Sequence, residues 1–230
     1  MSSFNFDIVV YGHLSFDNIY EGFNYKTSVG CMGNVWNQLK LINPDLRVKL
    51  EPTDIGESLI LADVEQCKRT SISRLSLKTR VPVIHDAIIS HVMYINELSD
   101  TSFIKNLKGY VTADVCNGKP INVDLEALKS IDILLISDED LNDPLKLTKL
   151  VNTVREYVIL HHAGGSTIYH KNGWQYTFTA EHVPNINVLG AGDKFAAYIL
   201  SECLDNTKNI SKVIQEAHNK LTEFFKNEKI

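Results

Sequence analysis

Four consecutive residues near the end of the chain, Gly190-Ala191-Gly192-Asp193, have the types and spacing needed to handle a phosphate group. They directly precede an apolar helical pattern that runs to Cys203. Small residues let a ligand approach the backbone, and N–H groups at a helix start bind anions. Asp193 is placed to accept a proton from a hydroxyl that attacks a phosphoryl group. A tight loop whose Asp only stabilises the helix start is the structural alternative, and these four residues alone do not decide between them.

Three further segments precede this one along the chain. They are Gly12-His13-Leu14-Ser15-Phe16-Asp17 after the first expected strand, Gly30-Cys31-Met32-Gly33-Asn34 at the first helix, and Ser137-Asp138-Glu139-Asp140-Leu141 after a mid-chain strand. With Gly190-Ala191-Gly192-Asp193-Lys194-Phe195 they resemble, in order and approximate spacing, the motifs of the PfkB (ribokinase) family of carbohydrate and nucleoside kinases. The resemblance extends over residues 7 to 225, and its last segment is the family's most specific motif.

The resemblance implies a kinase that moves the γ-phosphoryl group of ATP to a hydroxyl of a sugar, nucleoside or related polyol. It implies Mg²⁺ as cofactor, with room for a monovalent cation such as K⁺. Asp193 would be the base on the acceptor hydroxyl, and Gly190, Ala191 and Gly192 would form the anion hole. The residues implied to line the acceptor pocket are Asp17, Gly30, Gly33 and Asn34. Without the resemblance, Asp17 would be interpreted as a solvated loop carboxylate and Asn34 as a helix N-cap.

On the nucleotide side the chain departs from the family pattern. Asn187-Val188-Leu189 stands where members usually carry Asp-Thr, and His161-His162-Ala163 replaces a Thr-x-Gly pattern before Gly164-Gly165. Ser137 and Asp140 take the places of an Asn-x-x-Glu motif that organises magnesium, so Asp140 is the implied metal ligand. The resemblance therefore implies a nucleotide site built from Ser137, Asp140, His161, Gly165 and Asn187. Adjacent strand residues point to opposite faces, so His161 and His162 are not expected to share a metal.

The elements that must position these residues are visible as hydrophobic periodicity. Continuous apolar runs predict buried strands at 7–11, 87–89, 92–95, 111–115, 131–136 and 158–160. Helical spacing predicts helices from about Asn34 to before Pro44, through Ile60, Val64 and Cys67, across 147–154, from Ala196 to Cys203, and from Val213 to Leu221. Asn172-Gly173 predicts a hairpin between 167–170 and 174–178. This alternation predicts one ribokinase-like α/β domain over 1–230, with a mainly parallel central sheet flanked by helices on both faces.

The substrate lid of the family is expected to be reduced or absent in this shorter chain. Only Ile19 to Val29 separate the Asp17 segment from the Gly30 segment, and Leu75 to Val81 alternate like an edge or lid strand. Small lid elements are therefore predicted within 19–29 and 70–83. A reduced lid would leave the acceptor exposed to water and would suit a large acceptor. The exposed edge also indicates pairing with a second copy, as in a homodimer.

Composition excludes several other classes of protein. The chain has 230 residues, 44% of them hydrophobic and 22% charged, which is typical of a globular protein and not of a disordered one. The net charge of -5, without a basic cluster, argues against a nucleic-acid partner. No apolar run approaches the ~20 residues of a membrane span, and the first residues lack a signal-peptide pattern. A cytoplasmic protein is expected, with its four scattered cysteines as reduced thiols.

Motifs of other nucleotide-dependent and hydrolytic enzymes do not occur in the sequence. There is no GxxxxGK[ST] loop, no GxGxxG after the first strand, and no GxSxG elbow. Two alternatives to an ATP-dependent kinase stay open: a non-catalytic relative that binds nucleotide or sugar, and a kinase that uses a different phosphoryl donor.

Overall fold

The computed structural model describes residues 4–63, 68–76, 80–115, 123–141, 144–184, 186, 188–205 and 208–227. The strands are β1 Phe6–Glu21, β2 Asn24–Val29, β3 Val48–Asp63, β4 Lys68–Ser76, β5 Ala87–Met93, β6 Tyr110–Asp114, β7 Ile133–Ser137, β8 Tyr157–His162, β9 Gly165–His170 and β10 Gln175–Thr179. The α-helices are α1 Cys31–Ile42, α2 Leu125–Leu128, α3 Pro144–Thr153, α4 Ala191–Cys203 and α5 Ile210–Asn227. Three 3₁₀ turns, η1 Ile95–Glu97, η2 Ser102–Asn106 and η3 Asp138–Asp140, complete the described elements.

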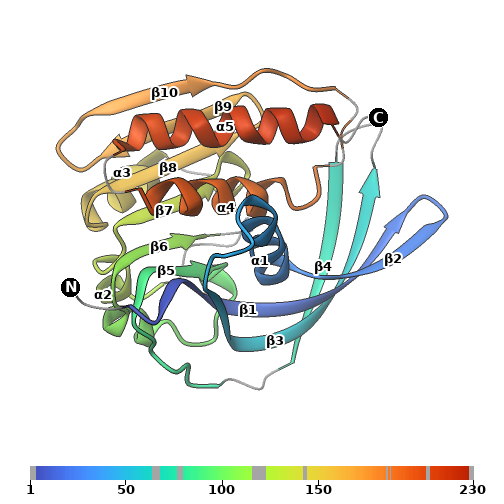
Figure 1. Cartoon of the computed structure of the whole chain (residues 1–230), viewed down its shortest axis with the longest axis horizontal. Helices are drawn as coiled ribbons and strands as arrows, with labels where there is room; N and C mark the ends of the chain where they lie inside the picture. The colour runs from blue at the N-terminus through green and yellow to red at the C-terminus, as the bar shows by residue number, and fades with distance from the viewer. Residues whose placement is uncertain are drawn as a thin grey trace.

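All ten strands form one sheet, in the order β10-β9-β8-β7-β6-β5-β1-β3-β4, with β2 paired to β1 (Figure 1). The pairs from β8 through β7, β6, β5 and β1 to β3 are parallel. The hairpin β9–β10 and the strands β2 and β4 pair antiparallel. Parallel strands need crossovers between them, which is why helices and long connections alternate with strands along the chain. The predicted mainly parallel α/β fold is therefore confirmed.

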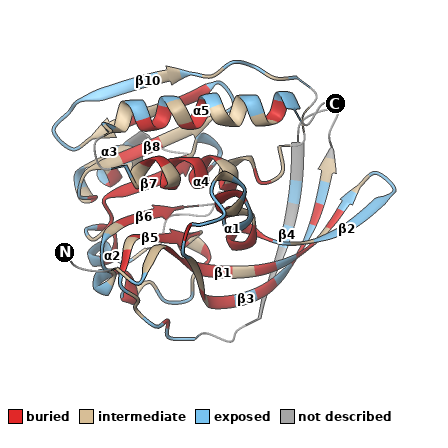
Figure 2. Cartoon of the chain, viewed as in Figure 1, coloured by how far each residue is buried: buried red, intermediate tan, exposed pale blue. Residues whose placement is uncertain are grey.

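The sheet is covered on both faces, as its apolar strands require. On one face, residues of α2, α3 and η2 pack with Val9, Tyr11 and Val158 into one core. On the other face, α1 and α4 pack over Ile8 and Val10, and α4 and α5 pack over β7, β8 and β9. Figure 2 shows the central strands and the inner sides of the helices as the buried parts of the chain. Parallel strands buried on both faces read as continuous apolar runs, so the sequence could reveal them.

Beyond the covered body, β1 and β3 continue outward and pair with β2 and β4 (Figure 1). We call this four-stranded extension the lid. It consists of residues 13–29, which include the end of β1 and all of β2, residues 54–63 of β3, and β4. It occupies the predicted ranges 19–29 and, as far as Ser76, 70–83; residues 77–79 lie outside the described part. Of the two alternatives expected, an absent lid is wrong, because β1 and β3 are 16 residues long and supply lid strands without extra chain.

Two other predicted elements need correction. Ile60 lies in β3 instead of a helix, while Val64 and Cys67 lie outside the described residues. The apolar run Leu59-Ile60-Leu61 belongs to a strand with apolar groups on both faces, which mimics helical spacing over a short window. The two strands predicted at 87–89 and 92–95 are one strand, β5, because Ser90 and His91 are buried in its middle.

Two buried histidines, His91 and His218, and the partly buried His161 make the stability of the fold depend on pH. Burial lowers the pKa of His91 to about 3 and those of His161 and His218 to about 4, from an ordinary 6.5. The unfolded chain therefore takes up protons first as pH falls. Their stabilising contribution is complete above pH 6.5 and is lost as pH falls toward 4.

We expect the thermal unfolding temperature to decrease as the pH is lowered from 7.5 to 5. Scanning calorimetry across that range would measure the decrease. His218→Gln keeps an amide within reach of Ser166, which His218 contacts at 2.9 Å, and removes one titrating group. It should make the pH dependence shallower. A midpoint that is constant over this range would contradict the assignment of neutral buried imidazoles.

Candidate active site

The predicted residues meet at the carboxyl edge of the parallel strands. Tyr94 follows β5, Ser137 ends β7, and His161 lies near the end of β8. The start of α4 approaches the same edge, since Gly192 lies next to His161. In open parallel sheets this edge is where ligands bind.

Asp193 lies in the first turn of α4 and is 3% exposed. Its Oδ2 accepts a hydrogen bond from Nδ2 of Asn34 at 2.7 Å, and its Oδ1 accepts one from the Tyr94 hydroxyl at 2.8 Å. The two donors come from α1 and from the residue that follows β5, and together they fix the carboxylate in one orientation. A carboxylate oxygen has two lone pairs, so one accepted hydrogen bond does not prevent it from accepting a proton. The positive end of the α4 dipole favours the ionised form that a base requires.

The loop before α4 needs glycine at position 190. Gly190 caps the helix with φ +72°, in the left-handed region, and a Cβ there would lie 3.2 Å from Nδ2 of Asn34. The Ala191 N–H donates to the carbonyl of Val188 at 3.0 Å, within the loop itself. Of the three residues predicted to form the anion hole, Gly190 and Gly192 therefore remain as the candidates for a ligand contact.

Gly192 allows the anion hole to be tested without damage to the fold. A Cβ at position 192 would meet only Cε1 of His161, at 3.9 Å, which is an ordinary contact. We expect Gly192→Ala to unfold at the same temperature as the wild type but to raise the Michaelis constant for the phosphoryl donor about tenfold or more, because a methyl group would occupy the space beside the phosphate. Calorimetry and steady-state kinetics would measure both. An unchanged donor constant would remove Gly192 from the site.

In the predicted acceptor pocket, Asp17 lies on lid strand β1, next to Gly30 at the start of α1. Its Oδ1 accepts hydrogen bonds from Ser15, at 2.8 Å, and from Ser58 on β3. A Cβ on Gly30 would lie 1.8 Å from Oγ of Ser15 and under 3 Å from both Asp17 oxygens. Gly30 thus lets the first turn of α1 touch the lid. Gly33 likewise makes room for Val29, because a Cβ on Gly33 would lie 2.6 Å from the Cβ of Val29.

The first turn of α1 connects the two carboxylates. Gly30 precedes the helix and contacts Asp17, whereas Asn34, four residues later, contacts Asp193. Residues four apart lie one helical turn from each other on the same face. Asn34 is therefore inside the helix and bonded to the predicted base, so its interpretation as an N-cap is wrong. This short span sets Asp17 and Asp193 on two sides of one site.

The nucleotide-side residues are arranged across β7, β8 and β9. Ser137 is paired with His161, and His161 is paired with Ser166. The His161 ring packs edge-on against Phe195 of α4, with ring centroids 5.8 Å apart. Gly165 has φ +137°, and a Cβ there would lie 2.0 Å from the carbonyl oxygen of Phe178, so the close approach of β10 alone explains this glycine. Asn187 lies outside the described residues.

Acidic groups follow Ser137 in η3, where the resemblance implies a magnesium ligand. Asp140 is 8% exposed. The described residues hold no group of three or more His, Cys, Asp or Glu side chains arranged for a metal. Mg²⁺ in kinases is commonly held by one or two carboxylates together with substrate phosphates, so Asp140 fits that role. Lys194, next to the predicted base, lies over the Phe224 ring at 5.0 Å.

Sequence reasoning missed Tyr94. This residue has φ +57°, and it is the one non-glycine residue with positive φ in the described chain. Side chains larger than Asn or Asp rarely adopt this conformation, and such strain concentrates at functional sites. Its position directly after a buried strand was the available signal, because carboxyl ends of parallel strands carry ligand-binding groups.

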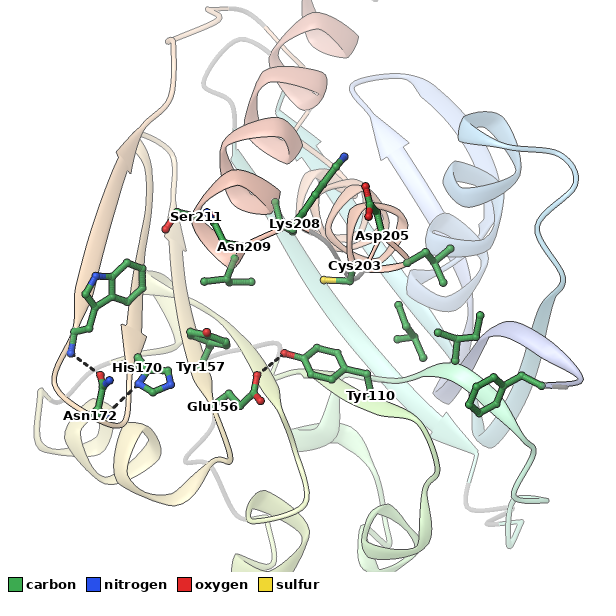
Figure 3. Close-up of a pocket in the computed structure, with 17 residues that line it drawn as sticks. Tyr110, Glu156, Tyr157, His170, Asn172, Cys203, Asp205, Lys208, Asn209 and Ser211 are labelled. Atoms are coloured by element: carbon green, nitrogen blue, oxygen red, sulfur yellow. Dashed lines mark hydrogen bonds between the residues drawn. The ribbon is translucent and has the colours of Figure 1, made fainter. Parts of the chain in front are cut away.

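A cavity of about 870 Å³ lies elsewhere, where β6 and β8 begin and α4 ends (Figure 3). Its lining includes Tyr110, Glu156, Tyr157, His170 and Cys203. The Tyr110 hydroxyl donates to Glu156 at 2.8 Å, and burial raises the pKa of the Cys203 thiol to about 12. None of the predicted site residues lines this cavity. It lies at the amino edge of the parallel strands, opposite Asp193.

Comparison with known proteins identifies the fold. No family model and no curated protein matches the sequence. Among solved structures, a pyrophosphate-dependent kinase in the ribokinase family, complexed with a pyrophosphate analog and myo-inositol, is 14% identical with a TM-score of 0.67, and 95% of each chain is covered. Arabidopsis thaliana ribokinase with ribose and ATP is 17% identical, with a TM-score of 0.65 and coverage of 94% and 91%. A Burkholderia thailandensis nucleoside kinase with inosine is 15% identical, with a TM-score of 0.64 and coverage of 94% and 89%. This chain therefore has the ribokinase fold.

Proposed function

We propose that this protein is a kinase of the ribokinase family that transfers the γ-phosphoryl group of ATP to a hydroxyl of a sugar, nucleoside or related polyol. The observation that carries the proposal is the buried Asp193 carboxylate, held by Asn34 and Tyr94 at the start of α4. A carboxylate fixed beside a glycine-lined helix terminus combines a base with an anion site. Fold resemblance alone would not assign an activity.

In the proposed reaction, the acceptor oxygen attacks the γ-phosphorus while its proton moves to a carboxylate oxygen of Asp193. The bond between the γ-phosphorus and the bridging oxygen breaks, and ADP leaves with that electron pair. Gly190 and Gly192 let the phosphoryl oxygens approach the N–H groups of the α4 start, which offset their charge. Asp140 would hold Mg²⁺, which would supply further charge neutralisation when bound.

Asp17 binds and orients the acceptor in this proposal. Ser15 and Ser58 both donate to its Oδ1, so the carboxylate is oriented before the acceptor arrives. A carboxylate accepts hydrogen bonds from hydroxyl groups, which suits a polyol. Positioning of this kind accounts for much of the rate enhancement in phosphoryl transfer.

A different donor is the second candidate, and one observation favours it. His161 replaces a small hydroxyl residue of the family pattern, and its ring fills space beside Gly192 and Phe195. Pyrophosphate has no nucleobase, so a site for it needs no adenine pocket. The similarity to a pyrophosphate-dependent kinase supports the same alternative.

Transfer of radioactive phosphate separates the candidates. Purified protein would be incubated with Mg²⁺ and a mixture of ribose, myo-inositol, inosine and a small-molecule cell extract, with either γ-labelled ATP or labelled pyrophosphate. We expect a labelled soluble product from ATP. A product from pyrophosphate alone would establish the second donor. Failure of both donors, together with an unfolding temperature that neither donor changes, would favour a non-catalytic relative.

We also propose that the protein is a homodimer that functions in the cytoplasm, where ATP and small polyols are available. The strand register places a set of exposed apolar residues on one face of the lid, the face opposite Asp17, which we call the outer lid face. Its members, each at least 36% exposed, are Phe16, Tyr20, Tyr25, Val29, Ile55, Leu59, Leu61 and Ile72. Four strands about 4.8 Å apart make a patch roughly 20 Å across, comparable with the ~800 Å² per partner of a stable interface. A sheet face that meets its own copy satisfies two-fold symmetry.

The outer lid face predicts a specific effect on oligomeric state. Leu59→Glu, at the centre of this face, should convert a dimer to a monomer in sedimentation velocity, because a buried unpaired charge is costly. Leu41→Glu is the matched control, since Leu41 is 75% exposed on α1, away from the lid face. A wild type that is monomeric at high micromolar concentration would rule out the dimer.

A further inference from the structure

The inner face of the lid carries a row of buried polar side chains. Residues two apart on a strand share a face, so His13, Ser15 and Asp17 of β1 lie on one side. Asp54 and Ser58 of β3 lie on the same side, because they pair with His13 and Asp17. All five are 8% exposed or less. The inner face of the lid therefore carries hydroxyl, carboxylate and imidazole groups.

Nearly every acceptor in this row is satisfied from within the protein. Asp54 accepts from the hydroxyls of Thr53, at 2.9 Å, and Ser99, at 2.6 Å. Oδ1 of Asp17 accepts from Ser15 and Ser58. Glu97 contacts Nδ1 of His13 at 3.0 Å. Buried polar groups are normally paired in this way, which makes an exception informative.

The exception is Nε2 of His13. This atom is buried and has no hydrogen-bond partner in the described structure, although the whole side chain is only 2% exposed. Because the Glu97 carboxylate accepts, Nδ1 carries a proton in that contact, and Nε2 is left to pair with a ligand. An unpaired buried nitrogen destabilises the fold, and a ligand hydroxyl that pairs with it would remove that cost.

We infer that His13, oriented by Glu97, binds a second hydroxyl of the phosphoryl acceptor, an inference that rests on the proposed kinase function. A hydroxyl can both donate and accept, so it can form a hydrogen bond with Nε2, which an apolar group cannot do. His13 and Asp17 are four residues apart on one strand, so their Cα atoms are about 13 Å apart. An acceptor that contacts both is larger than one sugar ring. The class is a two-ring polyol, such as a nucleoside or a disaccharide.

This role requires the lid to open and close. His13 and Asp17 are both buried without a ligand, so the acceptor reaches them only after the lid has moved away from the start of α1. Gly30 is the contact that the opening breaks, because it touches Ser15 and Asp17 directly. A lid that closes on the acceptor excludes water from the phosphoryl group, which protects it from hydrolysis.

Two substitutions separate a binding role of His13 from a structural one. His13→Asn places an amide near the Nδ1 position, keeps the Glu97 contact and removes the group at Nε2. His13→Gln places an amide near the Nε2 position and loses the Glu97 contact. A binding role predicts that His13→Asn raises the acceptor Michaelis constant at least tenfold, with the ATP constant unchanged, and that His13→Gln has the smaller effect. A structural role predicts the opposite order.

The experiment uses inosine and maltose as two-ring acceptors and ribose as the one-ring control, with transfer kinetics and thermal shift for each protein. Preference for a two-ring acceptor, lost in His13→Asn, supports the inference. An active wild type that prefers ribose, or whose His13→Asn variant keeps the same acceptor constant, overturns it while the kinase function stands. A wild type that neither phosphorylates nor is stabilised by any of the three also overturns the inference. The proposed function is judged separately by label transfer into the cell extract.

Discussion

Replacing Asp193 by Asn is expected to lower the turnover number about 10²- to 10⁴-fold, the usual contribution of a general base. The amide cannot accept the proton of the attacking hydroxyl. The fold should persist, because Asn has the same shape, its carbonyl oxygen can still accept from Asn34, and the Tyr94 hydroxyl can accept from the new amide. Steady-state kinetics with calorimetry would show a large loss of rate without a comparable loss of stability.

Asp86→Asn provides the matched control for this substitution. Asp86 is an exposed carboxylate that precedes β5 at the opposite end of that strand from Tyr94. Its ion pair with Lys108 is on the surface, where such pairs contribute little. We expect wild-type turnover from this variant. Equal losses in both variants would mean that Asp193 contributes through net charge alone.

Gly30→Ala is expected to have the largest effect on the lid. The added Cβ would lie 1.8 Å from Oγ of Ser15 and 2.8 Å and 2.9 Å from the Asp17 oxygens, so either the lid or α1 must shift. Overpacking of this kind costs about 1–3 kcal/mol. The shift would also separate Asp17 from the start of α1, and acceptor binding should weaken. Chemical denaturation and the acceptor Michaelis constant measure the two consequences.

A second substitution tests whether this contact is the cause. Ser15→Ala removes the oxygen nearest to the new methyl group, so the double variant should recover part of the stability that Gly30→Ala loses. Recovery should be incomplete, because the Asp17 oxygens remain too close. Gly22→Ala is the control glycine: it has positive φ but nothing within 4 Å of its Cβ position, so only backbone strain contributes there. Additive effects of the Gly30 and Ser15 substitutions would contradict a direct clash.

The sequence predicts the body of the fold and the helix start at Gly190 well, for identifiable physical reasons. Strands β6, β7 and β8 are buried on both faces, and such strands must be continuously apolar. The helix start at Gly190 requires a residue that tolerates positive φ, so its glycine is visible in the sequence. Asn172-Gly173 lies between β9 and β10, as the hairpin pattern predicts.

The lid and the hydrogen-bond partners of Asp193 were harder to predict. The two lid faces of β3 are both partly apolar, so Leu59 and Ile60 give no clean period-2 pattern. Tyr94 bonds Asp193 across 99 residues of chain, and local patterns carry no information on such a contact. The same applies to His13 and Glu97, which are 84 residues apart. Only the tertiary fold, which packs α4 and η1 against the ends of the strands, brings these groups together.

The most direct measurement of the central claim is the transfer of label from γ-labelled ATP into a soluble product by the wild type and by Asp193→Asn, side by side, with Mg²⁺ and a small-molecule extract of the source cells. A labelled product from the wild type, reduced at least a hundredfold in the variant, is the result expected of a general base. The same amount of product from both proteins would contradict the assignment of Asp193 as the base.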